Sequence, residues 1–166
     1  MIIPLHNKDG VAVAWASCDS FHYDRIAPIA WHLDSYGYAA CRVRLKCGQT
    51  WLVKMHNAII YPDDLSIKPS HQLVVDHING DRVDNRSANL RVCTRGQNLC
   101  NRGKTSLNTS GYKGVVFHQK KWKAQIGFQG RHRYIGVFDT QEEAHIAYCA
   151  KAKELHGEFF NPGAVS

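Results

Sequence analysis

The hydrophobic and polar positions divide the chain into three stretches of different character. The first 70 residues are mixed and irregular, with short apolar runs interrupted by turn-forming residues. They predict a strand at 11–15, a short helix at 19–27, a hairpin of strands 38–45 and 49–54, and a helical turn at 55–60 that ends before Pro62. By itself, this first stretch indicates no chemistry.

Residues 71–103 contain two short apolar runs, 73–76 and 90–93, on either side of a segment rich in Asn, Asp, Gly, Arg and Ser. Side chains of these types hydrogen-bond to nearby backbone, so the segment predicts an ordered loop held by its own side chains. Thr94 and Gln97 then match a capping box, which predicts a helix from there to about residue 102. The predicted order is strand, long loop, strand, helix.

The last stretch opens with a polar, turn-forming segment at 104–111, which predicts a linker. Three strand signals follow at 114–118, 121–128 and 131–138, with a tight turn at Gln129-Gly130 between the last two. Apolar and polar residues alternate along 121–128, which is typical of a half-buried antiparallel sheet. A second capping box, at Thr140 and Glu143, predicts a helix that ends at Gly157 and covers the apolar side of that sheet.

These elements predict an α+β fold, and 166 residues are enough for one compact domain or two small ones. A hydrophobic content of 44% with 21% charged residues excludes a disordered chain. No run approaches the length of a membrane span, and the first ten residues show no signal-peptide pattern. We therefore expect a cytoplasmic location and reduced cysteines.

The charge is unevenly distributed and favours a polyanionic partner. The net charge is +7, and residues 104–138 hold seven Lys or Arg side chains and no acidic residue. A basic run is often only a solvated face, but here it coincides with strand periodicity and aromatic residues, which indicates a nucleic-acid surface. No basic amphipathic helix supports attraction to a membrane.

Candidate chemistry lies at the end of the predicted strand 73–76. A neutral imidazole at His77 can take a proton from water, and the neighbouring Asp76 carboxylate and the helical Asn98 amide offer oxygens that suit a hard divalent cation. Taken singly, these residues also fit an exposed turn histidine, a loop-closing Asn89 and a surface amide. Spacings of 12 residues from His77 to Asn89 and 9 from Asn89 to Asn98, with a capped helix under Asn98, favour a common site.

The segments VVDHINGD, NRSANLR and RGQN resemble the HNH endonuclease family, specifically its phage-type homing enzymes. The resemblance implies a ββα-metal core, with Asp76 and Asn98 as ligands of Mg²⁺ or Mn²⁺ and His77 as the general base that activates water. It also implies that Asn89 ties down the loop and holds the His77 backbone. His56 lies in a helical turn that related proteins carry before the motif, and it is an accessory candidate.

The cysteines do not predict a metal site of their own. Cys41 and Cys47, like Cys93 and Cys100, are separated by more residues than the two to four of typical zinc pairs. We expect no structural zinc, and we expect Cys93 and Cys100 to be small core residues.

Residues 108–162 resemble the APETALA2/ethylene-response-factor DNA-binding domain in the segments YKGV, KWKAQI, YIGVFDT and EEAHIAYCAKA. The resemblance implies a three-stranded sheet that lies in the DNA major groove and one helix that braces its back. Val116 and Gly127 stand where plant members place guanine-reading arginines, so the plant target sequence is not implied. The resemblance assigns DNA contacts to Lys113, His118, Gln125, His132 and Tyr134, and their charge and place add Lys121, Lys123, Arg131 and Arg133 as phosphate partners.

The sequence thus predicts an HNH endonuclease region at 1–103, with its core motif at 71–103, and an APETALA2-like domain at 104–166. The expected activity is metal-dependent hydrolysis of double-stranded DNA, by a monomer or weak dimer that makes a site-directed nick, in the host cytoplasm if the chain is phage-encoded. Two alternatives stay open: a non-catalytic DNA-binding regulator that retains the fold, and a structural RNA-binding protein. Retention of all four motif residues argues against the regulator.

Overall fold

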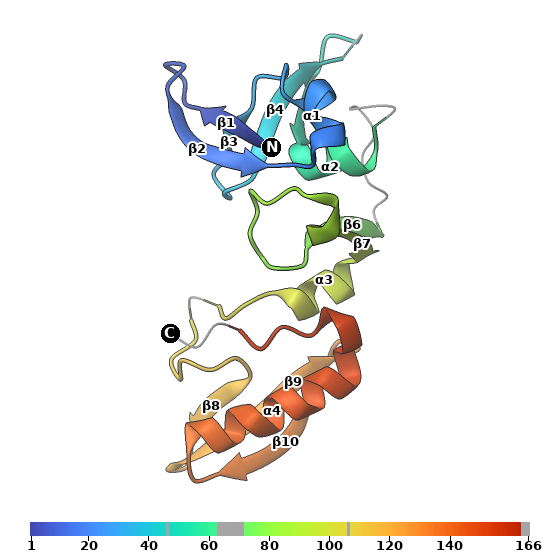
Figure 1. Cartoon of the computed structure of the whole chain (residues 1–166). Helices are drawn as coiled ribbons and strands as arrows, with labels where there is room; N and C mark the ends of the chain where they lie inside the picture. The colour runs from blue at the N-terminus through green and yellow to red at the C-terminus, as the bar shows by residue number, and fades with distance from the viewer. Residues whose placement is uncertain (46, 63–71, 106, 164–166) are drawn as a thin grey trace. The chain divides into compact units, whose positions relative to one another are not determined.

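The computed structural model describes residues 1–45, 47–62, 72–105 and 107–163 (Figure 1). They form an α+β protein of small antiparallel sheets and short helices. The chain divides into two compact units, Met1–Thr94 and Arg95–Ser166, and each is described by itself. Across the described ranges, no helix combines the length and apolar character that a membrane crossing requires.

The described residues of the first unit form three antiparallel sheets, β1-β2, β3-β4-β5 and β6-β7. The predicted helices at 19–27 and 55–60 and the hairpin of 38–45 with 49–54 are confirmed, and the strand expected at 11–15 lies slightly later. Two strands were not predicted. In β1, Pro4 interrupts a short apolar run that gains its pairing only from β2, and β3 is a two-residue strand that gains its pairing only from β4. The elements are β1 (Ile2–His6), β2 (Ala12–Ser17), α1 (Ser20–Ile26), β3 (His32–Leu33), β4 (Ala39–Arg44), β5 (Thr50–Lys54), α2 (Met55–Ile60), β6 (Leu73–His77), the 3₁₀ turn η1 (Ser87–Asn89) and β7 (Leu90–Thr94).

One hydrophobic core joins these sheets. Trp31 is 1% exposed, and its indole N–H donates to the Ile26 carbonyl at 2.8 Å, which satisfies its only polar group. Val75 of β6 and Leu90 of β7 belong to the same buried cluster as the residues of the N-terminal sheets and helices. The β6-β7 pair is therefore packed against the N-terminal region. Both ends of the loop between these strands are held in place by that packing.

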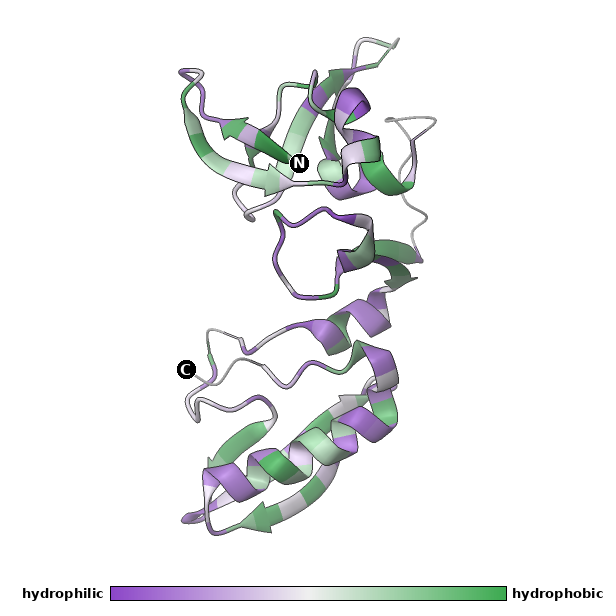
Figure 2. Cartoon of the chain, viewed as in Figure 1, coloured by the Kyte–Doolittle hydropathy of each residue, from purple (hydrophilic) through white to green (hydrophobic). Residues whose placement is uncertain are grey.

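The β6-β7 pair places charged side chains opposite one another at its end. In the antiparallel register, Asp76 lies across from Arg91 and His77 lies across from Leu90. The connecting residues 78–89 form the long loop predicted from composition, and Figure 2 shows that this loop is mostly hydrophilic. It is ordered, as expected for a segment with many Asn and Asp side chains.

The second unit consists of a three-stranded antiparallel sheet of order β10-β9-β8, with one long helix packed against it. The turn residues Gln119, Lys120, Gln129 and Gly130 all have positive φ, so both hairpins use two-residue turns of the type that matches strand twist. The capping box of Thr140 and Glu143 is present as predicted. The elements are α3 (Arg95–Asn101), β8 (Val115–His118), β9 (Lys121–Phe128), β10 (Arg131–Phe138), α4 (Gln141–His156) and the 3₁₀ turn η2 (Gly157–Phe159).

Small residues let α4 pack closely on the sheet. Ala144, Tyr148 and Ala152 of the helix are buried together with Ala124 and Ile126 of β9. At Gly114, just before β8, a Cβ would lie 2.1 Å from the Tyr148 ring, and φ is +77°. Glycine at this position therefore permits both the backbone conformation and the close approach of the helix.

The segment predicted as a linker is tied down by its own side chains. Ser110 is buried, and its hydroxyl donates to the Val115 carbonyl at 2.8 Å. The Asn108 side-chain amide donates to the Tyr112 carbonyl at 2.8 Å, and the Lys104 ammonium donates to the Gly111 carbonyl at 2.9 Å. The described residues of the predicted linker, 104, 105 and 107–111, contain no helix or strand, as expected, and residue 106 lies outside the described residues. The side chains of Lys104, Asn108 and Ser110 bond to backbone carbonyls of the turn and strand that follow.

Candidate functional site

Asp76 and His77 end strand β6, and both are buried, with exposed fractions of 6% and 4%. Arg91, opposite on β7, donates from Nε and Nη2 to Asp76 Oδ2 at 3.0 and 2.8 Å. The guanidinium balances the carboxylate charge and fixes the side chain beside His77. A carboxylate offers about four lone-pair positions, so this pairing is compatible with a further cation.

The orientation of His77 is set by a residue that the sequence did not single out. Its Nε2 lies 3.2 Å from Asn85 Oδ1, and the Asn85 amide nitrogen donates to the Val83 carbonyl at 3.1 Å. Because that bond identifies the Asn85 oxygen as an acceptor, His77 Nε2 carries the proton and Nδ1 carries the basic lone pair. Burial lowers the pKa of His77, so the imidazole is neutral near pH 7 and suited to accept a proton.

Two more rings lie beside His77. The His56 ring centroid lies 4.9 Å away and the Tyr38 centroid 5.9 Å away, and these two rings are themselves 5.3 Å apart. Burial lowers the pKa of His56 to about 3, and neighbouring positive charge at His77 and Lys54 acts in the same direction. The accessory candidate His56 therefore packs against the catalytic candidate as a neutral ring.

Two cations lie against Tyr38 in the same region. Lys54 Nζ is 3.7 Å from the centre of its ring, and the Arg82 guanidinium carbon is 5.1 Å from it. Both distances suit a cation–π contact. The basic side chains thus stand close to the ring cluster that contains His77.

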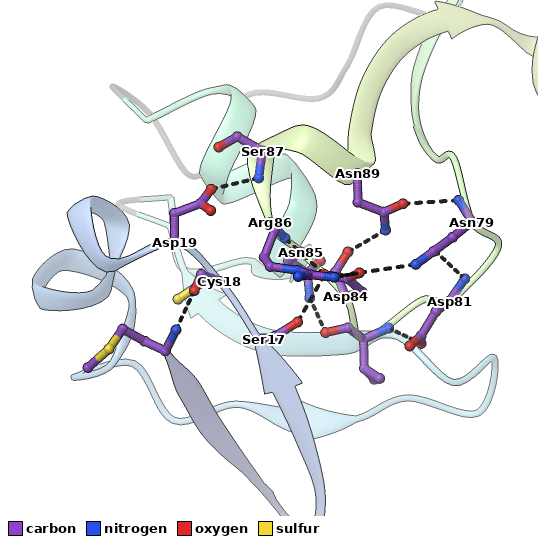
Figure 3. Close-up of polar contacts among 12 residues, drawn as sticks. Ser17, Cys18, Asp19, Asn79, Asp81, Asp84, Asn85, Arg86, Ser87 and Asn89 are labelled. Atoms are coloured by element: carbon purple, nitrogen blue, oxygen red, sulfur yellow. Dashed lines mark hydrogen bonds and ion pairs between the residues drawn. The ribbon is translucent and has the colours of Figure 1, made fainter. Parts of the chain in front are cut away.

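The loop between β6 and β7 is held from inside by Asn89 and Asp84 (Figure 3). The Asn89 side chain accepts from the Asn79 backbone N–H at 3.0 Å and donates to the Asp84 carbonyl at 2.8 Å. It therefore ties the two sides of the loop together through bonds at Asn79 and Asp84. That Asn89 holds the His77 backbone stays a prediction. The Asp84 carboxylate accepts from Asn79 Nδ2 at 3.0 Å and pairs with Arg86 at 2.7 Å.

The loop is also docked on the N-terminal elements, which sequence reasoning missed. The Asn85 N–H donates to the Ser17 carbonyl at 2.8 Å, and the Ser17 hydroxyl donates to Asp84 at 3.0 Å. The Ser87 N–H donates to the Asp19 carboxylate at 2.6 Å. The bonds from Arg86, with a smaller contribution from Ser17, hold the pKa of Asp84 far below its usual range. The end of β2 and the start of α1 thus form the platform under the loop.

The side chains present suit a hard divalent cation in part. Over the ranges that the structure describes, no three His, Cys, Asp or Glu residues gather into a metal-holding cluster. Asp76 nevertheless offers carboxylate oxygen next to His77, and ions such as Mg²⁺ commonly use one or two carboxylates together with water and substrate phosphates. Asn98 lies in α3, which belongs to the second unit, and its side chain is half-buried. Of the two candidate ligands, Asp76 is thus the one that lies in the same unit as His77, directly beside it.

Cys93 is buried as expected, whereas Cys100 is only partly buried and its thiol bonds to the Gly96 carbonyl. The expectation that both are core residues was wrong for Cys100, which is half-buried in α3 and belongs to neither hydrophobic cluster of the described residues.

The sheet of the second unit presents a polar face away from α4. Because side chains alternate along a strand and paired residues share a face, the register puts Lys121, Lys123 and Gln125 on the side opposite Ala124 and Ile126. The same register adds residues of the two neighbouring strands. We call this set the open face: His118, Lys121, Lys123, Gln125, His132 and Tyr134.

Three predicted DNA contacts lie elsewhere. Arg131 and Arg133 pair with Phe128 and Ile126, which puts them on the α4 side of the sheet, and the Arg133 guanidinium lies 4.8 Å from the Phe128 ring. Lys113 donates from its ammonium to the backbone carbonyls of Cys100 and Asn161. On the open face, Lys121 pairs with Asp139 at 2.9 Å.

Some of the missed features had a signal in the sequence. A two-residue turn at Gln129-Gly130 pairs Arg131 with Phe128, so the face of Arg131 followed from the predicted hairpin. Asn85 had no such signal, because its contact with His77 depends on the path of the whole loop.

Comparisons with known proteins agree with this arrangement. Residues 68–100 match the family model described as HNH endonuclease. An uncharacterized HNH endonuclease of Acanthamoeba polyphaga mimivirus is 29% identical over 140 residues, which is 84% of this chain and 70% of the relative. Protein 3.8 of Escherichia phage T7 is 29% identical over 87 residues, or 51% of this chain and 71% of the relative.

A different set of relatives matches a shorter part of the chain. An AP2-like ethylene-responsive transcription factor of Arabidopsis thaliana is 43% identical over 56 residues, which cover 31% of this chain and 16% of that protein. No solved structure gives a significant match. The chain therefore combines a segment that matches the HNH endonuclease model with a region similar to ethylene-responsive transcription factors.

Proposed function

We propose that this protein is a divalent-metal-dependent DNA endonuclease of the ββα-metal type, which nicks duplex DNA at a position selected by its C-terminal sheet. The observation that carries the proposal is the state of His77: it is buried at the end of β6 beside Asp76, with Nε2 held by Asn85. A neutral, oriented imidazole next to an oxygen ligand is the arrangement that general-base hydrolysis of a phosphodiester needs.

In the proposed reaction, His77 Nδ1 takes a proton from a water molecule, whose oxygen attacks phosphorus. The bond from phosphorus to the 3′ oxygen breaks, that oxygen takes a proton from solvent water, and His77 returns its proton to solvent. The products carry a 5′-phosphate and a 3′-hydroxyl. Asp76 and Asn98 would hold Mg²⁺ or Mn²⁺, which stabilises negative charge on the phosphate and the departing oxygen when bound. Arg91 keeps the Asp76 carboxylate in place.

The open face supplies the affinity and the choice of site. Lys121 and Lys123 offer positive charge for phosphates, and Gln125, His132 and Tyr134 offer groups for base edges. One His77 in each chain accounts for a nick, and two binding events would cut both strands. A site-directed nick by a free-standing enzyme of this kind suits a homing endonuclease that acts in the cytoplasm of an infected host cell.

The second candidate is a DNA-binding regulator without catalytic activity. The match to ethylene-responsive transcription factors favours it, because those relatives are named as transcription factors. A regulator would bind duplex DNA through the open face and would leave the DNA intact at every metal concentration.

A plasmid-nicking assay separates the two candidates. Supercoiled plasmid is incubated with the full chain in Mg²⁺, in Mn²⁺ and in excess chelator, and the nicked form is quantified over time. The endonuclease produces nicked circles with 5′-phosphate ends in either metal and none in chelator. Duplex binding without nicks in both metals would support the regulator, and nicking that persists in chelator would remove the metal from the mechanism.

A further inference from the structure

Lys113 is the one residue of the predicted DNA-contact set whose charged group is bonded to backbone inside the second unit. Its ammonium donates to the Cys100 carbonyl at 2.8 Å and to the Asn161 carbonyl at 2.9 Å. The first carbonyl belongs to α3 and the second to the segment after η2. Burial lowers the pKa of Lys113, in keeping with an ammonium turned into the protein.

Asn161 makes a second set of bonds to the same helix. Its side-chain amide nitrogen donates to the Asn101 backbone carbonyl at 2.8 Å and lies 3.3 Å from the Asn101 side-chain oxygen. Its own oxygen accepts from the Gly163 N–H at 2.8 Å, which fixes the amide orientation. Asn101 is 6% exposed, so these bonds form at a buried helix end. We call Lys113, Asn161 and their partners at Cys100 and Asn101 the clasp.

The clasp joins α3 to the turn before β8 and to the segment after η2. Lys113 lies directly before Gly114 and β8, and Asn161 follows η2, which itself packs on α3. The bonds also satisfy backbone carbonyls at the C-terminal end of α3, which a seven-residue helix leaves without partners of its own. Together with the tied-down residues 107–112, they make α3 part of the same compact unit as β8–β10 and α4.

We infer that Lys113 and Asn161 are positioning residues that set where the enzyme cuts relative to the sequence it reads. This inference rests on the proposed function, in which α3 carries the metal ligand Asn98 and the open face reads the DNA. A helix fixed to the reading sheet gives a fixed offset between the recognised bases and the nick. A helix joined only by a loose chain would give a spread of offsets.

The test compares Asn161→Leu and Lys113→Met with wild type and with Lys120→Met, all as the full chain. Lys120→Met is the matched control because Lys120 is exposed in the β8–β9 turn, outside the clasp. The probe is a pool of duplexes with a randomised segment, cut in Mg²⁺, and sequencing of the nicked ends gives the preferred sequence and the offset. We expect a single offset for wild type and the control, and offsets spread over about three or more nucleotides for both clasp variants, with the preferred sequence unchanged.

A second measurement does not depend on cleavage. Amide hydrogen exchange of α3 should accelerate at least about tenfold in both clasp variants, while exchange in β9 and β10 stays at the wild-type rate. Unchanged offsets in both variants would overturn the inference, and so would unchanged exchange of α3. Lys113→Met with a weaker duplex affinity, a salt slope reduced by about one ion and an unchanged offset would instead make Lys113 a phosphate contact.

The two arms also separate this inference from the proposed function. If wild type cuts no duplex in Mg²⁺, the proposed function fails, and the exchange of α3 alone still decides whether the clasp exists. If wild type cuts with one offset and the clasp variants do the same, the proposed function stands and the positioning role fails.

Discussion

The loop between β6 and β7 and the open face of the second unit are both rich in polar side chains, and they use them in opposite ways. In the loop, Asp84, Asn85 and Asn89 are buried and bonded to the protein itself. On the open face, His118, His132 and Tyr134 are exposed. Bonds satisfied within the protein pre-organise a reactive group, whereas exposed polar groups are left for a partner. Polarity alone therefore does not distinguish a site that reacts from a surface that binds.

The first prediction breaks the loop at the residue with the most bonds. Asp84→Ala removes the acceptor for Ser17, Asn79 and Arg86, and we expect the free energy of unfolding to fall by about 3 kcal/mol. Asp81→Ala is the matched control, because Asp81 is exposed in the same loop and its side chain accepts only the Val83 N–H in Figure 3. Urea titration of both variants checks this, with a loss under about 1 kcal/mol expected for the control. Equal losses would show that Asp84 does not hold the loop.

The second prediction removes the partner of His77 and leaves the loop closed. Asn85→Ala deprives His77 Nε2 of its acceptor, so the imidazole loses its fixed tautomer and orientation. We expect single-turnover cleavage to slow about 10- to 100-fold with duplex affinity unchanged. Asn85→Asp keeps an acceptor oxygen and should retain more of the rate. Equal rates for Asn85→Ala and wild type would remove Asn85 from the site.

The third prediction uses the buried ring beside His77. The pKa of His56 in the folded chain, about 3, lies below its ordinary value of about 6.5. Between these two values the unfolded chain binds a proton at His56 and the folded chain does not. His56 therefore does not change the free energy of unfolding above about pH 6.5, and it lowers the free energy of unfolding as the pH falls below that value. Between pH 7.5 and pH 5, wild type should lose about 2 kcal/mol more than His56→Gln. Urea titrations at the two pH values measure the difference, and parallel losses would contradict the burial of a neutral His56.

The fourth prediction concerns the open face, where single changes should have the smallest effects. Lys123→Met removes one phosphate partner, so duplex affinity should fall on all sequences alike, and the slope of log affinity against log salt should decrease by about one. Arg133→Met is the matched control on the α4 side of the sheet. Binding titrations at several salt concentrations test this pair. A larger salt effect for Arg133→Met would place the DNA on the other side of the sheet.

Local patterns were enough to predict most of the helices and strands of this protein. The loop at 78–89 followed from its Asn, Asp and Gly content, and the sheet and helix of the second unit followed from alternation along 121–128 and from the capping box at Thr140. These features depend on neighbours in sequence, which is why the sequence contains them. Strand β1 was missed because its partner, β2, stabilises it from outside the segment.

The candidate site was predictable in its residue types and not in its contacts. Asp76 and His77 were singled out as neighbours in a local motif, but the platform formed by Ser17 and Asp19 lies about sixty or more residues away along the chain. Lys113 illustrates the same limit, since the family resemblance assigned it as a DNA contact and only the fold shows its ammonium on two carbonyls. Contacts between residues that lie far apart in the sequence leave no local pattern in it.

The most direct test of the account measures cleavage and binding of His77→Ala on the same duplex. His77 is proposed to act on the proton of the attacking water, so its loss should affect the transition state and leave the open face untouched. We predict a single-turnover rate in Mg²⁺ about 10²- to 10⁴-fold below wild type, with a duplex Kd within about twofold of it. A His77→Ala protein that cuts at the wild-type rate would contradict the central claim, and so would one whose loss of cutting is matched by an equal loss of binding.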